Sequence, residues 1–202
     1  MIYLGLGSNL SSSFGDRFVN IDLALSYLEI YKIKVVKKSS YYETPSYPDK
    51  NKPKFINIVI EVSTELPPVD LASVLVFIEE KLERTRLVKN DPRTCDIDII
   101  DYKNKILNFK YKNMDFTIPH KKIIDRNFVL IPLKEISPAW QHPVSNTLID
   151  DFINKLPEED KNSILKIKKS WYNIIMLNQK DLIEKVKTYN RFLNPETLSK
   201  AY

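Results

Sequence analysis

Hydrophobic and polar residues follow one another along this chain in patterns that predict alternating strands and helices. Residues 1–6 form a short apolar run typical of a buried strand, and a helical pattern with one apolar face follows a loop rich in serine. Residues 33–42 and 55–62 are rich in β-branched and aromatic residues, and a loop containing prolines and lysines separates them. We expect these two runs to pair as antiparallel neighbours.

A second helix is predicted from residue 67 to about residue 84, because five apolar residues recur there at helical spacing. These residues are Leu71, Val74, Leu75, Ile78 and Leu82. Residues 95–102 then return to a strand pattern. The resulting order, β-α-β-β-α-β, predicts an α+β fold of the ferredoxin-like sandwich type.

The last predicted strand carries two acidic residues in the stretch PRTCDIDII. Because side chains alternate between the faces of a strand, Asp96 and Asp98 project together, whereas Cys95 and the neighbouring isoleucines point the other way. Two carboxylates about 6 to 7 Å apart require a cation between them, and Mg²⁺ favours oxygen ligands of this kind. An exposed polar strand face is the alternative, but Arg93 lies three residues away and favours a phosphate site.

Composition limits the class of protein. A chain of 202 residues with 43% hydrophobic residues can bury one sizeable core. No apolar run approaches the roughly 20 residues of a membrane span, and the start of the chain lacks the pattern of a signal peptide, so we expect a cytoplasmic protein without a membrane partner. The single cysteine, Cys95, excludes an internal disulfide, and its apolar face indicates a core residue with no catalytic role.

The net charge of +5 arises from many lysines and only six arginines. Arg84, Arg86 and Arg93 nevertheless fall within ten residues, and Arg126 follows. Such clustering has two interpretations: guanidinium groups that bind phosphate, or ion pairs with the glutamates of the preceding helix.

Two histidines occur in the chain. His120 precedes a run that contains Lys121, Lys122 and Arg126, a combination that could bind phosphate. His142 lies in a loop-like stretch and is interpreted as a surface or structural residue.

Five stretches occur in order and together resemble a known family. They are GLGSNL, YYETP, FIN, PRTCDIDII, and IPH followed by RNFVLIPL. The chain thus resembles 6-hydroxymethyl-7,8-dihydropterin pyrophosphokinase, an enzyme of folate biosynthesis, over residues 1–157. The resemblance implies a ferredoxin-like fold and transfer of pyrophosphate from ATP, the co-substrate, to the hydroxymethyl group of the pterin, with release of AMP. It also implies two Mg²⁺ ions and small-molecule substrates, with no nucleic acid as partner.

The resemblance implies a role for each matching residue. Phosphate transfer would depend on Arg84, Arg93, Asp96 and Asp98, and the two aspartates would hold the metal. ATP would bind to Glu79, Arg86, Thr117, His120, Lys121 and Arg126. The pterin would bind to Gly7, Thr44, Pro45, Tyr47, Phe55, Asn57 and Phe128, between the two aromatic faces.

The stretch GLG raises its own question, because the chain has only three glycines. A glycine matching Gly7 is common to the family beside the pterin, and a side chain there would crowd the ligand. A dinucleotide-binding fold is the alternative, but the third glycine and the downstream acid of that fingerprint are missing.

Three positions depart from the family pattern. The loop before Pro92 lacks a customary Trp-Gly pair and is one residue shorter than usual, so a weaker exclusion of water and slower turnover are expected. Glu83 stands where a glycine is common, and Ser46 with Tyr47 replaces a stretch that usually contains proline.

Residues 158–202 lie beyond the resemblance. Apolar residues there recur at helical spacing from Ile164 onward and predict two amphipathic helices, which we expect to pack on the first domain or to join subunits in an oligomer. A two-metal nuclease and an RNA-binding module are rival interpretations of the basic, aspartate-bearing sheet. A nuclease usually needs further carboxylates, and an RNA-binding sheet has no use for paired aspartates. Release of AMP that depends on the pterin would separate all three.

Overall fold

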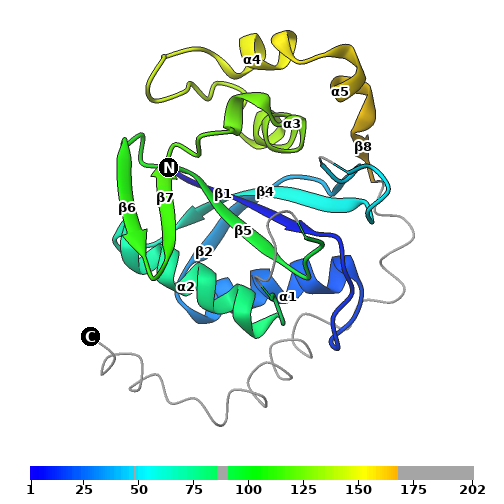
Figure 1. The fold of residues 1–202 in the computed structure, drawn as a ribbon. Coiled ribbons are helices and arrows are strands. Elements are labelled where there is room, and N and C mark those ends of the chain that lie inside the picture. The colour runs from blue at the N-terminus through cyan, green and yellow to red at the C-terminus, as the bar shows by residue number, and fades with distance from the viewer. Residues whose placement is uncertain (48, 86–90, 168–202) are drawn as a thin grey trace. The chain divides into compact units, whose positions relative to one another are not determined.

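The computed structural model describes residues 1–47, 49–85 and 91–167. A six-stranded antiparallel sheet forms the centre of this part, with the strand order β5-β1-β4-β3-β8 and with β2 also paired to β4 (Figure 1). The strands of this sheet are β1 (Ile2–Ser8), β2 (Lys34–Lys38), β3 (Tyr42–Thr44), β4 (Phe55–Ser63), β5 (Asp96–Tyr102) and β8 (Leu165–Lys166). The fold is therefore a mixed α/β fold with an antiparallel sheet, in agreement with the predicted class at this level.

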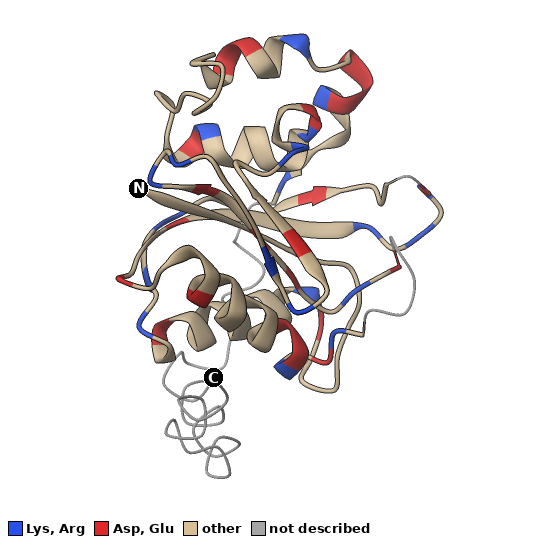
Figure 2. Ribbon diagram, turned by 60° about the vertical axis from the view of Figure 1, so that its left-hand side comes forward, with Lys and Arg blue, Asp and Glu red and all other residues tan. Residues whose placement is uncertain are grey.

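Helices cover both faces of the sheet. On one face lie α1 (Arg17–Ile30) and α2 (Pro68–Lys81), and on the other lie α3 (Asn127–Ile136) and α4 (Ile149–Lys155) (Figure 1). Both helices predicted from apolar spacing are confirmed, with α1 beginning after Asp16, whose carboxylate accepts hydrogen bonds from two backbone N–H groups of the first turn. Charged residues lie at loops and helix ends and also on strands of the sheet, where β2 carries three lysines and β5 three aspartates (Figure 2).

A second apolar core joins the sheet to α3 and α4. Tyr3, Val59 and Ile100 contribute from three neighbouring strands, and Leu130 and Leu133 contribute from α3. Trp140, in the connection from α3 to α4, donates a hydrogen bond from Nε1 to the buried Asp101 carboxylate at 2.9 Å. Ile123, in the segment that precedes α3, belongs to the same core, which holds this segment against the sheet.

The predicted strand over residues 33–42 is divided in the structure. Both of its parts, β2 and β3, pair with β4 in the antiparallel sense that the sequence predicts. Ser39 separates them, because its backbone N–H bonds to the Val59 carbonyl while its hydroxyl accepts the Val59 N–H at 3.0 Å. The Ser39 hydroxyl thus accepts a hydrogen bond that a backbone carbonyl would accept in a regular strand.

Three small elements complete the described chain. The hairpin of β6 (Leu107–Tyr111) and β7 (Met114–Ile118) follows β5, and a short 3-10 helix, η1 (Ile123–Asp125), precedes α3. The last helix is α5 (Glu158–Ser163). In the described ranges, no helix has both the length and the apolar character needed to cross a bilayer.

The end of the described chain corrects one prediction. The helical pattern assigned from Ile164 is wrong up to Ile167, because Leu165–Lys166 forms β8 and the Ile167 N–H bonds to the Tyr41 carbonyl at 2.8 Å. Backbone groups that would form hydrogen bonds within a helix here form them with the edge of the sheet. The other residues of the two predicted C-terminal helices, and their predicted role in oligomers, lie outside the described residues.

Candidate active site

Strand β5 brings the two predicted carboxylates to one face of the sheet. Asp96 and Asp98 both line the same cavity, whereas Ile97 and Ile99 are buried on the opposite face. Cys95 is fully buried, and burial raises the pKa of its thiol well above the usual value. The alternation predicted from the sequence is confirmed, and so is the structural role of the cysteine.

Two arginines neutralise Asp96. Arg84 Nη1 lies 2.5 Å from Asp96 Oδ1, and Arg93 Nη1 lies 2.7 Å from Asp96 Oδ2. Arg84 also forms an ion pair with the buried Glu79, whose Oε1 accepts the Ile97 N–H at 2.7 Å. Burial alone would lower the pKa of Arg84, but the carboxylates of Asp96 and Glu79 outweigh it and raise the pKa. Arg84 thus forms an ion pair with a glutamate of α2, as one of the two interpretations of the arginine cluster predicts. The same guanidinium also contacts Asp96.

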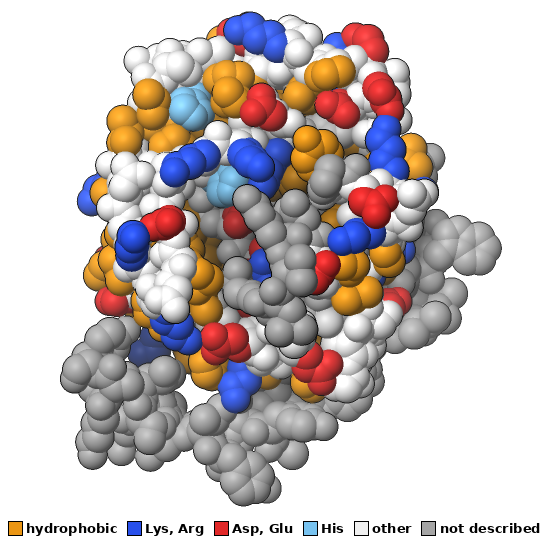
Figure 3. All heavy atoms as spheres, viewed as in Figure 1, with side chains coloured by type: hydrophobic (Ala, Val, Ile, Leu, Met, Phe, Trp, Pro, Cys, Tyr) orange, Lys and Arg blue, Asp and Glu red, His pale blue; other side chains and the backbone are white. Residues whose placement is uncertain are grey.

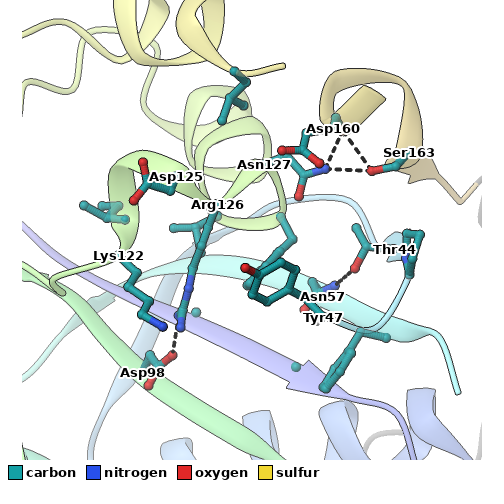
Figure 4. A pocket seen from close by; sticks show the side chains of 18 of the residues that line it. Thr44, Tyr47, Asn57, Asp98, Lys122, Asp125, Arg126, Asn127, Asp160 and Ser163 are labelled. Carbon is teal, nitrogen blue, oxygen red and sulfur yellow. Dashed lines mark hydrogen bonds and ion pairs between the residues drawn. The ribbon is translucent and has the colours of Figure 1, made fainter. Parts of the chain in front are cut away.

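Asp98 faces a second set of cations, from the segment between β7 and α3. Arg126 Nη1 lies 3.2 Å from Asp98 Oδ2, and His120 Nε2 lies 4.0 Å from the same oxygen. Burial lowers the pKa of His120, the Asp98 carboxylate opposes this shift, and the Arg126 charge adds to it. Lys122 points towards the same place (Figure 4). The two carboxylates are therefore enclosed by arginine, histidine and lysine.

A neutral half of the cavity adjoins this charged half. Asn57 and Thr44 are both buried, and Asn57 Nδ2 donates a hydrogen bond to Thr44 Oγ1 at 2.9 Å (Figure 4). Gly7 pairs with Asn57 across the sheet, and a Cβ at Gly7 would lie 3.0 Å from Asn57 Oδ1 and 3.5 Å from the Phe55 ring. A side chain at this position would push the amide out of place, which accounts for glycine here.

Two aromatic rings line the cavity, each next to an arginine. The Arg93 guanidinium lies 5.5 Å from the centroid of Phe55, and the Arg126 guanidinium lies 5.4 Å from the centroid of Phe128. Cation-π contacts of this kind hold a charged side chain against a flat apolar face. The rings expected to bind the pterin are therefore connected to groups expected to bind phosphate.

The cavity that joins both halves has a volume of about 870 Å³. It brings together most of the predicted residues: Gly7, Thr44, Pro45, Tyr47, Phe55, Asn57, Arg93, Asp96, Asp98, His120, Arg126 and Phe128. Glu79, Arg84, Thr117 and Lys121 do not line it, and Arg86 lies outside the described residues. On the face shown in Figure 3, Lys and Arg side chains gather beside a histidine, with hydrophobic surface next to them.

Several lining residues were not predicted as site residues. They are Ser46, Lys50, Lys122, Asn127, Phe152, Leu156, Asp160 and Ser163, among others. Lys122 stands beside the predicted Lys121, and a sequence pattern in a loop does not reveal which of two neighbours turns inward. Residues 152–163 lie beyond the motifs, so no signal in the sequence connects them with the site.

The donor set of the cavity fits a divalent metal. Asp96 and Asp98 present hard oxygen donors on one face, and Mg²⁺ typically takes one or two carboxylates, with water and phosphate oxygens filling its other positions. Within the described residues, no group of three or more His, Cys, Asp or Glu side chains is gathered as a metal site. A metal held by these two carboxylates would therefore need ligands from a substrate or from water.

Comparison with known proteins places the chain in a family. The model of the family described as 7,8-dihydro-6-hydroxymethylpterin-pyrophosphokinase (HPPK) matches residues 3–138. The chain belongs to the HPPK family. This membership confirms the resemblance seen in the five sequence stretches, and it covers β1 to α3, which carry most of the cavity.

Relatives of two lengths support the assignment to HPPK. A 2-amino-4-hydroxy-6-hydroxymethyldihydropteridine pyrophosphokinase of Aquifex aeolicus is 33% identical over 151 residues, which are 75% of this chain and 89% of the relative. The folic acid synthesis protein fol1 of Pneumocystis carinii is 37% identical over 164 residues, which are 81% of this chain and 21% of the relative. The chain thus spans about a fifth of the length of the folic acid synthesis proteins that it matches.

Solved structures agree on the fold. The crystal structure of wild-type HPPK-DHPS of Plasmodium falciparum superposes with a TM-score of 0.60 at 18% identity, over 76% of this chain and 44% of that chain. A triple mutant with pteroate gives a TM-score of 0.65 at 16% identity, over 82% of this chain and 46% of that one. At such low sequence identity, these matches show a similar fold and nothing further.

Proposed function

We propose that the protein transfers pyrophosphate from ATP to the hydroxymethyl group of 6-hydroxymethyl-7,8-dihydropterin and releases AMP, a step of folate biosynthesis. The observation that carries the proposal is the single cavity in which paired aspartates and arginines adjoin an aromatic, amide-bearing pocket. Membership of the HPPK family supports this function, and the strand order supports the finer assignment of a ferredoxin-like sandwich. The single buried cysteine suits a reducing compartment, and we place the enzyme in the cytoplasm.

In this proposal the charged half binds the triphosphate. Arg93, Arg126 and His120 would contact phosphate oxygens, and Asp96 and Asp98 would hold two Mg²⁺ ions. The metal would neutralise phosphate charge and hold the triphosphate for in-line attack. Because arginines now occupy both aspartates, binding requires an exchange of partners, in which each carboxylate gives up its guanidinium to phosphate. The acceptor oxygen then bonds to the β-phosphorus as the bond from that phosphorus to the AMP oxygen breaks, so that AMP leaves with this oxygen and the hydroxyl proton is released to water.

The neutral half would bind the flat acceptor. Phe55 and Phe128 supply aromatic faces, and the amide of Asn57 with the Thr44 hydroxyl supplies hydrogen-bonding groups next to them. Pro45 and Tyr47 line the mouth, where Tyr47 is 79% exposed. A flat heterocycle with several donors and acceptors fits this set better than a nucleic-acid strand, which would need stacking residues on an open sheet face.

The remaining residues predicted to bind ATP fall into two groups. Thr117, Lys121 and Arg86 remain predictions for the adenosine and triphosphate. Glu79 and Arg84 lie behind Asp96, where they form an ion pair that orients the aspartate. We therefore propose that Glu79 acts through Arg84, and that Arg84 reaches phosphate once the metal binds Asp96.

The decisive experiment measures AMP release from ATP and Mg²⁺ with and without the pterin. We expect AMP only when the pterin is present, and we expect Asp98→Asn to lower kcat by about 100-fold or more, because a charge-stabilising group at the reacting phosphates is lost. Asp115→Asn is the matched control, since Asp115 forms an exposed ion pair with Lys110 on the hairpin and does not line the cavity. ATP cleavage without the pterin, or nuclease activity, would refute the proposal.

A further inference from the structure

One wall of the acceptor half is built by a segment beyond the residues that the family model matches. The match ends at residue 138, yet residues 155–157 and three residues of α5 line the cavity. The three are Glu159, Asp160 and Ser163. We call residues 157–167 the strap, because they run from the end of α4 to β8 at the edge of the sheet (Figure 1).

One end of the strap is tied to the first turn of α3. Asn127 is 8% exposed, and its Nδ2 donates hydrogen bonds to the Asp160 carbonyl at 2.5 Å and to Ser163 Oγ at 3.0 Å (Figure 4). This amide stands between Arg126, which contacts Asp98, and Phe128, which lines the cavity. Helix α3 begins without a capping side chain, so the link to the strap restrains a turn that lacks the usual restraint.

The other end of the strap is tied to the sheet. Residues of β8 pair with β3, and the Ile167 N–H bonds to the Tyr41 carbonyl at 2.8 Å. Lys166 Nζ lies 3.1 Å from Glu135, a carboxylate of α3 that also accepts a hydrogen bond from the Tyr42 hydroxyl at 2.8 Å. Because β3 contains Thr44, the strap connects the two sides of the acceptor pocket: the amide and hydroxyl pair on the sheet and the ring on α3.

We propose that the strap positions Phe128 and closes the acceptor end of the cavity, so that it sets the affinity for the pterin, with Asn127 as the positioning residue. This inference rests on the proposed function. The ion pairs described for Asp96 and Asp98 join these carboxylates to Arg84, Arg93 and Arg126, which do not belong to the strap. Loosening the strap should therefore affect one substrate and spare the other.

The test uses the full chain with two variants that release opposite ends of the strap. Asn127→Leu keeps the size of the side chain but removes the donor, and Ile167→Pro removes the backbone N–H that reaches Tyr41. Each is expected to raise the KM for the pterin by about three- to tenfold, the value of a lost hydrogen bond, with the KM for ATP and kcat within about twofold. Ile167→Val, which keeps the N–H, should match the wild type.

The outcomes are separable. If the wild-type protein releases no AMP with the pterin, the proposed function fails and the strap is not at issue. If the wild type is active but both variants keep its KM for the pterin, or raise both KM values equally, the strap inference is overturned. Thermal melting of each variant ensures that kinetics are measured on folded protein. Should Asn127→Leu not fold, Ser163→Ala and Ile167→Pro decide the question by the same split between the two KM values.

Discussion

The two halves of the cavity are assembled in different ways. In the charged half, Arg84, Arg93 and Asp96 lie within thirteen residues of one another, and their contacts are ion pairs. In the neutral half, Thr44 and Asn57 meet Phe128 and the strap, which come from segments far apart in the sequence. The surroundings of Asp96 in the charged half therefore come from one strand and the residues shortly before it, and only Asp98 faces cations from a distant segment, whereas the neutral half exists only when four segments are packed together.

The difference also concerns energy. An ion pair that is shielded from water depends on each partner, because removal of one leaves a buried charge without compensation. Hydrogen bonds and aromatic faces in the neutral half contribute less individually, so their loss should be seen mainly in binding. The two halves should respond differently to substitution, in stability on one side and in substrate affinity on the other.

The largest effect is expected at Arg84, whose side chain is 8% exposed between Glu79 and Asp96. Arg84→Met should lower the free energy of unfolding by about 3 to 5 kcal/mol, because the buried Glu79 carboxylate loses the guanidinium charge that faces it. Arg17→Met is the control, since Arg17 pairs with Glu43 at a partly exposed site where a loss of only about 1 kcal/mol or less is expected. Urea denaturation at neutral pH measures both values. Equal losses for the two variants would remove the distinction drawn for the charged half.

A smaller effect is expected from Asn57, which is buried against Thr44 in the neutral half. Asn57→Leu should weaken binding of the pterin by about tenfold or more, since it removes a hydrogen-bonding group and leaves the Thr44 hydroxyl without its donor. Binding of ATP should change by less than about twofold, as calorimetric titration can establish. Asn108→Leu, on the exposed face of β6, provides a comparison that should alter neither affinity. Parallel losses for ATP and the pterin would mean that the two halves are not independent.

How far the sequence predicts each half follows from the same difference. The sequence predicts the pair of carboxylates in the charged half, because alternation along a single strand places Asp96 and Asp98 together. The structure confirms this placement. The loop residues of the charged half were harder to predict from the sequence: Lys122 lines the cavity where Lys121 was expected. In the neutral half, Phe55 and Asn57 on β4 were implied by the resemblance to the family, and both line the cavity.

The strap could not be predicted from the sequence, for a physical reason. Residues 164–167 carry apolar residues at a helical spacing, but their backbone is recruited by the open edge of β3, a tertiary interaction that local periodicity does not report. The break at Ser39 has the same origin, since a hydroxyl replaces a backbone group in the ladder. Helices that pack on the sheet through an apolar face were predicted well, because the local spacing of apolar residues determines that face.

The smallest effect is expected at Glu83, which directly precedes Arg84. Substitutions there separate the contribution of backbone strain to stability from that of charge. Glu83 has a φ of 64°, in the left-handed region, and its carboxylate accepts hydrogen bonds from the Ser13 N–H at 2.9 Å and from the Ser13 hydroxyl. Glu83→Ala and Glu83→Gly both remove these bonds, but only glycine adopts the backbone conformation freely. The alanine variant should therefore be less stable than the glycine variant by about 1 kcal/mol, the reverse of the usual order for these residues. Urea denaturation of both variants gives the difference, and a more stable alanine variant would show that the backbone at this position shifts to accommodate a side chain.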